Sequence, residues 1–256
     1  MQKTCIVIPC YNEEKRLPVE EFVDFFHMHD DFDFCFVNDG SKDNTLGVIE
    51  KLLHLDPDRI FVVDLKQNVG KAEAVRKGIL YSLQNDKYSY FGYFDADFAT
   101  PLSELDTLMD AFIRNEECLF VVGSRIKRLG ANINRKTHRH YTGRIFATAA
   151  SMILRLPVYD TQCGAKLLKR SVVEVMFAEQ FISRWLFDVE IFARLTANIG
   201  YKNILDHIYE VPLNCWIEKG GSSLQFSYMY KVPVELFRIS RKYHLGLTSK
   251  GIQSPS

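Results

Sequence analysis

The sequence lacks several patterns that would assign it at once to a common class of protein. It has no run of roughly 20 apolar residues, the length that a membrane-spanning helix requires, and no Cys-x-x-Cys pair among its six cysteines. The scattered cysteines therefore indicate buried thiols in a reducing compartment, not a disulfide framework or a zinc site. Net charge is also absent, with 32 basic and 32 acidic side chains, which argues against general nucleic-acid binding.

Two glycine-rich nucleotide motifs are missing as well. Gly-x-Gly-x-x-Gly does not follow the first apolar segment, which counts against a dinucleotide-dependent dehydrogenase. Gly-x-x-x-x-Gly-Lys-[Ser/Thr] is absent too, which counts against a P-loop NTPase. The 256 residues are 47% hydrophobic, enough for one large α/β domain or two small ones.

The first half of the chain alternates short apolar segments with helical patterns. Phe22, Phe25 and Phe26 share one face of a helix predicted over about 18–28, and another helix is predicted over 71–83. Strand–helix repeats with short connections predict an α/β fold, a mostly parallel central sheet with helices on both faces. The predicted strands are 4–9, 32–37, 59–65, 90–94 and 119–122.

A pair of carboxylates, Asp95 and Asp97, follows the predicted strand 90–94, and Thr100 with Pro101 then reads as the start of a helix. Ligands of open α/β sheets collect at the carboxyl ends of the strands. Two carboxylates there repel each other unless a cation lies beside them, and Mg²⁺ or Mn²⁺ carrying a diphosphate fits this need. The alternative is a solvated turn, because Asp-x-Asp alone is a common sequence.

Residues 125–144 contain no acidic side chain, and Gly130, Asn132 and Asn134 predict a mobile loop. The segment is either a solvated basic loop or a contact for phosphate or an anionic membrane. Its basic residues are Arg125, Lys127, Arg128, Arg135, Lys136, Arg139 and Arg144.

The second half is less regular. Helical patterns carry Ile145 and Met152, and later Val189 and Phe192, and 204–211 reads as a strand with 213–217 as a second candidate. A last helix over about 227–243 is amphipathic and could lie on a membrane surface or pack on the domain or a partner. We therefore divide the chain into one main α/β domain, 1–223, and a C-terminal amphipathic helix with a flexible tail, 224–256.

The ordered strand-end motifs at residues 9–13, 38–41, 95–97 and 123–125 together resemble the family 2 inverting glycosyltransferases, which have a GT-A fold. Arg139 and the segment 160–166 (Asp-Thr-Gln-Cys-Gly-Ala-Lys) are similar to the polyprenyl-phosphate branch, which includes dolichyl-phosphate glucosyltransferases and mannose synthases. The resemblance covers roughly residues 3–223. One departure is Ala165, where the family usually has an aromatic residue.

The resemblance implies a binding site for a nucleotide-sugar. A carboxylate is a strong acceptor, so Asp39 would receive the N–H of a uracil or guanine ring. Asp95 would hold the ribose and share the Mg²⁺ or Mn²⁺ with Asp97, which would be the direct metal ligand. The other residues implied at this pocket are Pro9, Tyr11, Glu13 and Lys71.

The resemblance also implies a polyprenyl-phosphate acceptor. Such a phosphate is already largely anionic near neutral pH, so it needs cationic positioning more than a general base. Arg125 and Arg139 would supply the positive charge, with Arg144 as a further candidate. Asp160 would orient the acceptor or act as a base, and Asp188 and Glu190 compete for that role.

The predicted activity is metal-dependent transfer of one sugar from a UDP- or GDP-sugar to polyprenyl phosphate with inversion at the anomeric carbon. The same fold acting on a saccharide or protein hydroxyl is the main alternative, and a non-catalytic nucleotide-sugar-binding protein is another. A sugar-phosphate nucleotidyltransferase would need a Gly-rich, Arg-containing loop where this chain has Tyr11, Asn12 and Glu13. We expect a cytoplasmic protein, peripheral at the cytoplasmic face of a membrane or recruited by a separate membrane partner.

Overall fold

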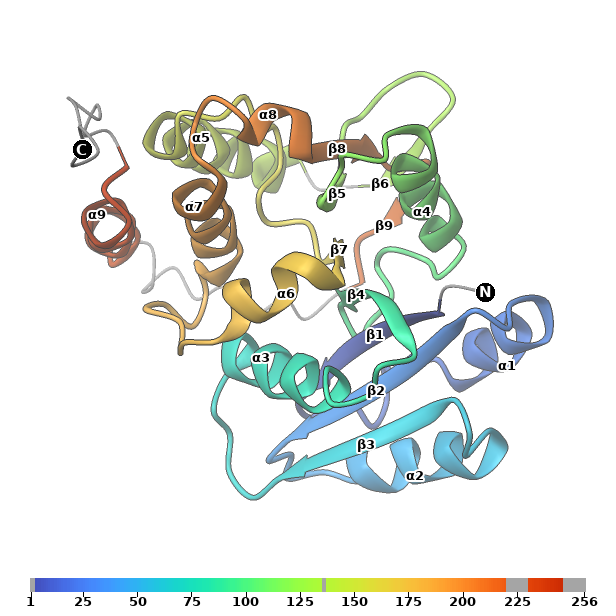
Figure 1. Cartoon of the computed structure of the whole chain (residues 1–256). Helices are drawn as coiled ribbons and strands as arrows, with labels where there is room; N and C mark the ends of the chain where they lie inside the picture. The colour runs from blue at the N-terminus through green and yellow to red at the C-terminus, as the bar shows by residue number, and fades with distance from the viewer. Residues whose placement is uncertain (1–2, 135–136, 220–229, 246–256) are drawn as a thin grey trace.

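The computed structural model describes residues 3–134, 137–219 and 230–245, and the side chains of 137–142 are not included in that description. Within these ranges the central sheet has seven strands in the order β3-β2-β1-β4-β7-β5-β8 (Figure 1). These strands are β1 (Lys3–Cys10), β2 (Phe32–Asp39), β3 (Ile60–Leu65), β4 (Tyr88–Phe94), β5 (Phe120–Ser124), β7 (Ala165–Lys169) and β8 (Ile208–Pro212).

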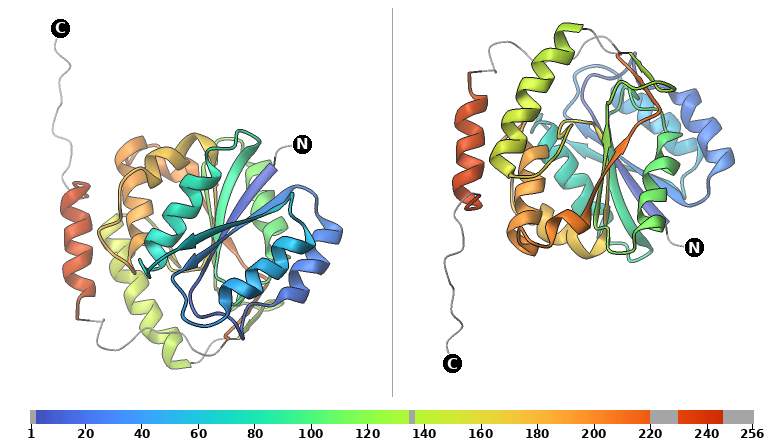
Figure 2. Two further views of the ribbon diagram at one scale, coloured as in Figure 1. Left: turned by 90° about the horizontal axis from the view of Figure 1, so that it is seen from below. Right: turned by 90° about the horizontal axis from the view of Figure 1, so that it is seen from above.

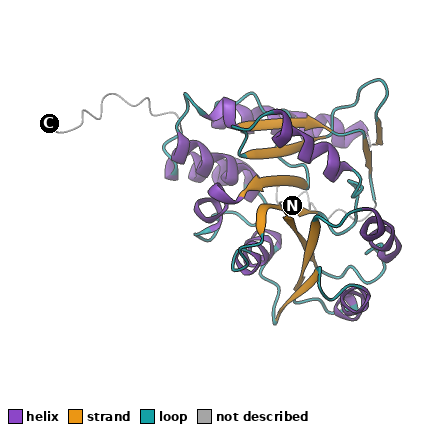
Figure 3. Cartoon of the chain, turned by 45° about the vertical axis from the view of Figure 1, so that its right-hand side comes forward, coloured by secondary structure: helices purple, strands orange, loops and turns teal. Residues whose placement is uncertain are grey.

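Helices cover both faces of this sheet, as the layers in Figure 3 show. One face packs on α1 (Val19–Met28), α2 (Thr45–Leu55) and α4 (Glu104–Arg114). The other packs on α3 (Lys71–Ser82), α5 (Thr137–Leu154), α6 (Arg170–Phe177) and α7 (Phe187–Ile199), with α9 (Val232–Lys242) outside them. The α/β fold class is confirmed, and the five strands predicted in the first half agree with β1 to β5 within two residues at each end.

Strand β7 is the one strand of the sheet that runs against the others, since it pairs antiparallel with both β4 and β5. The sequence did not predict it, nor α6, which follows directly. Its five residues include Lys166, which is fully buried. A charged side chain in so short a segment hides the apolar character on which strand prediction depends.

Several boundaries differ from the predicted ones. The helix expected at Pro101 begins at Glu104, because the residues after Asp97 form a turn in which Phe98 has φ +45°. The segment expected as a strand over 204–211 starts with α8 (Ile204–His207) and becomes extended only in β8.

The prediction of a loop over 125–144 is wrong for the second half of this segment. It contains β6 (Asn132–Asn134), which pairs in parallel with β9 (Cys215–Ile217), and the first residues of α5. Ile133 is buried beside its register partner Trp216. Such a pairing depends on residues about 80 positions further along the chain, which local sequence patterns do not reveal.

Helix α9 lies along α5 and α7 at the edge of the molecule, where Figure 2 shows it beside α5. Leu236 and Ile239 face the core, whereas Phe237 is 65% exposed. On α5, Ile145 and Met152 are each 73% exposed. In the part of the chain that the structure describes, we find no helix with the length and apolar character that crossing a membrane demands.

Candidate active site

The predicted carboxylate pair lies at the carboxyl end of β4, in the middle of the sheet. Asp95 Oδ1 accepts a hydrogen bond from Lys71 Nζ at 2.5 Å, and this lysine is the first residue of α3. Burial alone would lower the pKa of Lys71, but the Asp95 carboxylate more than offsets this and the pKa is raised. Lys71 therefore stays protonated at neutral pH, and its positive charge offsets the negative charge of Asp95.

Asp97 is less well neutralised. Its Oδ1 accepts the Ala99 N–H at 3.0 Å, and burial together with the charge of Asp95 raises its pKa above the ordinary value. A cation bound beside this carboxyl would stabilise its charged form. The oxygens of this pair are the ligand type that Mg²⁺ and Mn²⁺ prefer, so the residues present fit the expected metal.

The start of β7 closes in on the same carboxylate. A Cβ atom added to Gly164 would lie 1.9 Å from Asp95 Oδ2, so only glycine leaves room for this side chain. The Gly164 carbonyl also accepts the Asp95 N–H at 3.1 Å. The segment 160–166 and the carboxylate pair therefore form a single site, although they are about 65 residues apart in the sequence.

Glu13 adds a third carboxylate from the loop after β1. Its Oε1 accepts from Arg16 at 2.6 Å, while Oε2 is buried without a hydrogen-bond partner among the described residues. Burial, opposed by Arg16 and reinforced by Asp97 and Asp95, raises the pKa of Glu13 to about 7. Pro9 ends the same strand region, and Tyr11 is 40% exposed at the edge of the site.

Asp39 is already engaged at the end of β2. Its Oδ1 accepts the Val69 N–H at 2.7 Å, and its Oδ2 accepts the Gly70 N–H and the Asn68 amide, each at 2.9 Å. The carboxylate therefore holds the turn that leads into Lys71. The sequence did not predict this internal role, and base recognition by Asp39 would use the acceptor capacity that remains.

The residues predicted for the acceptor form a second cluster. Arg125 donates to both oxygens of Asp160, at 2.6 and 2.8 Å, and its guanidinium lies 5.4 Å from the Trp216 ring. Glu210 on β8 accepts the backbone N–H groups of Tyr159 and Asp160 at 2.8 and 2.7 Å. Sequence reasoning missed Glu210, whose contacts are with backbone atoms 50 residues away.

Arg144 and Arg139 are the other two cations predicted for the acceptor. Arg144 stacks over the ring of Tyr159, with its guanidinium carbon 3.8 Å from the ring centre. Arg139 belongs to α5, but its side chain lies outside the described residues. Tyr159 adjoins Asp160, so Arg144 flanks the Arg125–Asp160 pair.

Asp188, the competing candidate for the base, is buried at the start of α7. Its Oδ1 accepts from Lys166 Nζ and from the Tyr93 hydroxyl, both at 2.6 Å. Lys166 and Tyr93 were not predicted, and a lysine between apolar residues on β7 is the signal that could have found the pair. Glu190 points into a separate cluster with Arg194 and Tyr243, so it is not part of this site.

Comparisons with known proteins agree with this architecture. A sequence profile of the family described as "Glycosyl transferase family 2" matches residues 5–177. Dolichyl-phosphate beta-glucosyltransferase ALG5D of Trichomonas vaginalis is 30% identical over 94% of this chain and 74% of its own length. The dolichyl-phosphate beta-glucosyltransferase of Dictyostelium discoideum is 31% identical over 94% of this chain and 75% of its own length.

Among solved structures, glucosyl-3-phosphoglycerate synthase from Mycobacterium tuberculosis in complex with Mn²⁺, UDP-glucose and phosphoglyceric acid superposes with a TM-score of 0.68. The match covers 94% of this chain and 80% of that one at 18% identity, which establishes a shared fold.

Proposed function

Because the chain belongs to glycosyl transferase family 2, we propose that it transfers glucose from UDP-glucose to dolichyl phosphate. The chain is a glycosyltransferase, and the two relatives described above are named for transfer to this lipid phosphate. The choice of UDP-glucose rests on their names and on the ligand of the M. tuberculosis structure.

One observation carries the choice of a phosphate acceptor. The two predicted base candidates that lie in this site are held by cations, Asp160 by Arg125 and Asp188 by Lys166. An acceptor hydroxyl must lose a proton during transfer, so it needs a free base within reach. A phosphate monoester is already anionic and needs no such base. The paired carboxylates therefore suit a phosphate better than a hydroxyl.

On the donor side, the residues of this chain bind and orient the nucleotide-sugar. Tyr11 and Glu13 border the pocket, Asp39 holds the turn before α3, and Lys71 faces the diphosphate beside Asp95. Asp97, with Asp95, would hold Mg²⁺ or Mn²⁺. When bound, the metal supplies positive charge that stabilises the leaving UDP.

On the acceptor side, Arg125 positions the lipid phosphate, and Arg144, stacked over Tyr159, adds positive charge. An oxygen of the phosphate attacks the anomeric carbon of glucose from the face opposite UDP. The new C–O bond forms as the bond to the β-phosphate breaks, UDP leaves with the electron pair, and the anomeric centre is inverted. No proton changes hands, so correct positioning is the main contribution of the protein.

We further propose that the protein meets the cytoplasmic face of a membrane through α5 and α9. The exposed side chains Ile145, Met152 and Phe237 come from these neighbouring helices. Arg238 and Arg241 are exposed beside Phe237, and no acidic residue occurs in α5. Apolar side chains flanked by cations suit the surface of an anionic bilayer.

The proposal is tested by measuring UDP release from UDP-glucose with Mn²⁺ and one of three acceptors: a short-chain dolichyl phosphate, the matching dolichol, or 3-phosphoglycerate. We expect release that depends on dolichyl phosphate and stays at background with the other two. Release with dolichol or 3-phosphoglycerate instead would show that the acceptor is a hydroxyl.

A further inference from the structure

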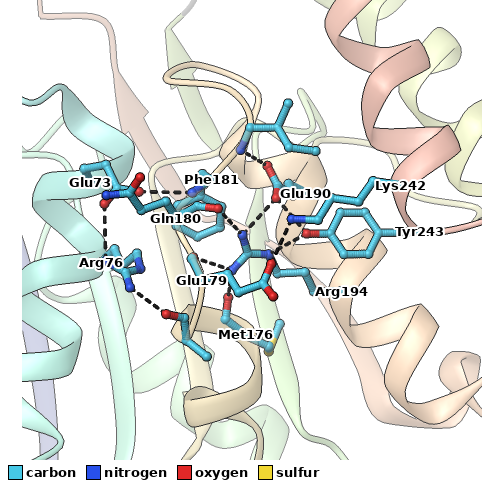
Figure 4. Close-up of polar contacts among 12 residues, drawn as sticks. Glu73, Arg76, Met176, Glu179, Gln180, Phe181, Glu190, Arg194, Lys242 and Tyr243 are labelled. Carbon is cyan, nitrogen blue, oxygen red and sulfur yellow. Dashed lines mark hydrogen bonds and ion pairs between the residues drawn. The ribbon is translucent and has the colours of Figure 1, made fainter.

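A buried ion pair that the proposed reaction does not use lies on the inner side of α7. Glu190 and Arg194 are one helical turn apart, both nearly inaccessible, and joined at 2.8 Å (Figure 4). Two buried charges are expensive to desolvate unless their remaining hydrogen-bonding capacity is satisfied. Two other parts of the chain supply these remaining hydrogen bonds to Glu190 and Arg194.

The first part is the segment that connects α6 to α7, residues 178–186, which we call the α6–α7 segment. Arg194 donates to the carbonyls of Glu179 and Gln180 at 2.9 Å each, and to that of Met176 just before the segment at 2.7 Å. Glu190 Oε2 accepts the Ile182 N–H at 2.7 Å. The ion pair therefore fixes the backbone of this irregular segment.

The second part is the C-terminal helix. The Tyr243 hydroxyl, at the end of α9, donates to Glu190 Oε1 at 2.8 Å and accepts from Arg194 Nε at 3.0 Å. Glu235, in the first turn of α9, accepts from the Ser183 hydroxyl of the α6–α7 segment at 2.5 Å. Both ends of α9 thus hold the same segment.

The opposite side of the α6–α7 segment lies on α3, close to the donor site. Phe181 N–H donates to Glu73 at 3.0 Å, and Arg76 donates to the Ala178 carbonyl at 2.5 Å. Arg184 packs against Gly70, where an added Cβ would lie 3.3 Å from its Nε. Gly70 precedes Lys71 and donates its N–H to Asp39.

We propose that Glu190, Arg194 and Tyr243 are positioning residues for donor binding, because together they press the α6–α7 segment onto the turn that carries Gly70 and Lys71. Helix α9 is then part of the donor-binding apparatus, although none of its residues touches the donor. The proposal rests on the proposed function in one respect only, namely that this turn binds the nucleotide-sugar.

The test compares Tyr243→Phe with a matched control, Tyr230→Phe. Each substitution removes one hydroxyl, the first from the buried cluster and the second from a side chain just before α9 that is 70% exposed. UDP-glucose affinity is measured by calorimetry, and KM and kcat are measured for donor and acceptor separately.

For Tyr243→Phe we expect the Kd and KM for UDP-glucose to rise about fivefold, as loss of one hydrogen bond to a charged cluster can produce, with KM for the lipid acceptor unchanged. Tyr230→Phe should stay within about twofold of the wild type, as is usual for surface substitutions. Hydrogen exchange should show faster exchange in the α6–α7 segment of Tyr243→Phe, and UDP-glucose should restore its protection.

Wild-type donor affinity in Tyr243→Phe, or an equal loss in Tyr230→Phe, would overturn the proposal. Glu235→Gln provides a second variant if Tyr243→Phe does not fold, since it weakens the contact with Ser183 and should also raise the donor Kd. Wild-type protein that binds UDP-glucose but does not glucosylate dolichyl phosphate would contradict the proposed function and leave the comparison of donor affinities valid.

Discussion

Three carboxylates and two cations, Lys71 and Arg16, set the electrostatics of the candidate site. Glu13, Asp95 and Asp97 come from two adjacent strand ends, and burial, reinforced by the negative charges of the two aspartates, raises the pKa of Glu13. Lys71 donates to Asp95, and Arg16 donates to Glu13. The cluster therefore has negative charge in excess, and Mg²⁺ or Mn²⁺ with a diphosphate would rebalance it.

Asp97→Asn removes this negative charge at the residue predicted to bind the metal directly. We expect kcat to fall by about 100-fold or more, because metal assistance to a leaving phosphate is worth several kcal/mol. Mn²⁺ binding, followed by electron paramagnetic resonance, should weaken in parallel. Asp58→Asn, at an exposed position, serves as the control and should leave both unchanged. Full activity in Asp97→Asn would remove this residue from the metal site.

Glu13 predicts a pH dependence of stability. Its pKa is raised from 4.5 to about 7 in the folded protein, so folding favours the protonated form. Its contribution to stability is therefore complete below pH 4.5 and is lost as the pH rises to about 7. Glu13→Gln mimics the protonated form and should be more stable than the wild type, by a margin that grows over this range and then levels off.

Thermal unfolding of the metal-free protein at a series of pH values measures this margin. The exposed Glu20→Gln should show no such trend. A margin for Glu13→Gln that shrinks with rising pH would contradict the assignment.

At the scale of elements, β7 determines how the two halves of the site meet. It inserts antiparallel between β4 and β5, brings Gly164 against Asp95, and places Lys166 opposite Asp188. The Lys166 side chain is fully buried. The Tyr93 hydroxyl also donates to Asp188, and Lys166 also donates to the Cys163 carbonyl. Such a satisfied pair fixes geometry more than it stabilises the fold.

Lys166→Met tests this view by leaving Asp188 as a buried carboxylate without its cation. We expect a loss of about 3–5 kcal/mol in the free energy of unfolding, measured with urea. The double variant Lys166→Met, Asp188→Leu should regain most of that loss. A Lys166→Met variant as stable as the wild type would show that loss of the lysine does not leave Asp188 as an uncompensated buried charge.

The sequence predicted the elements whose partners are local or whose periodicity is strong. The strands β1 to β5 are rich in apolar β-branched or aromatic residues, and α1 and α3 have clear apolar faces, so their bounds agree closely with prediction. Strand β9 lies within the predicted candidate strand 213–217. Strands β7 and β6 were not predicted, because their burial depends on residues far along the chain: Asp188 for Lys166, and Trp216 for Ile133.

The same reasoning explains what could be foreseen of the site. Asp95, Asp97 and Arg125 follow strands, and the carboxyl ends of parallel strands meet at one edge. The ion pairs that occupy Asp160 and Asp188 could not be foreseen, because each depends on the tertiary placement of β5, β7 and α7. The division of the chain at residue 223 stays a prediction.

At the scale of the whole molecule, α5 and α9 form one edge, far from α2 across the sheet (Figure 1). The double variant Ile145→Ser, Phe237→Ser removes exposed apolar side chains from both helices. We expect its binding to phosphatidylserine-containing vesicles to fall by about 30-fold or more, since the two side chains together contribute on the order of 2–4 kcal/mol.

Turnover with a short, water-soluble polyprenyl phosphate should be unchanged in that variant. Leu55→Ser on α2, which is 56% exposed, is the matched control and should bind vesicles like the wild type. Equal loss of vesicle binding in Leu55→Ser would mean that the membrane contact is not confined to the α5–α9 edge.

The most direct test of the central claim is transfer of radiolabelled glucose from UDP-glucose to dolichyl phosphate by the wild type and by Asp97→Asn. The account predicts a lipid-linked product with the β configuration, formed only by the wild type and only with Mg²⁺ or Mn²⁺. Product formed equally by Asp97→Asn, or donor consumption with no label on the lipid, would contradict it.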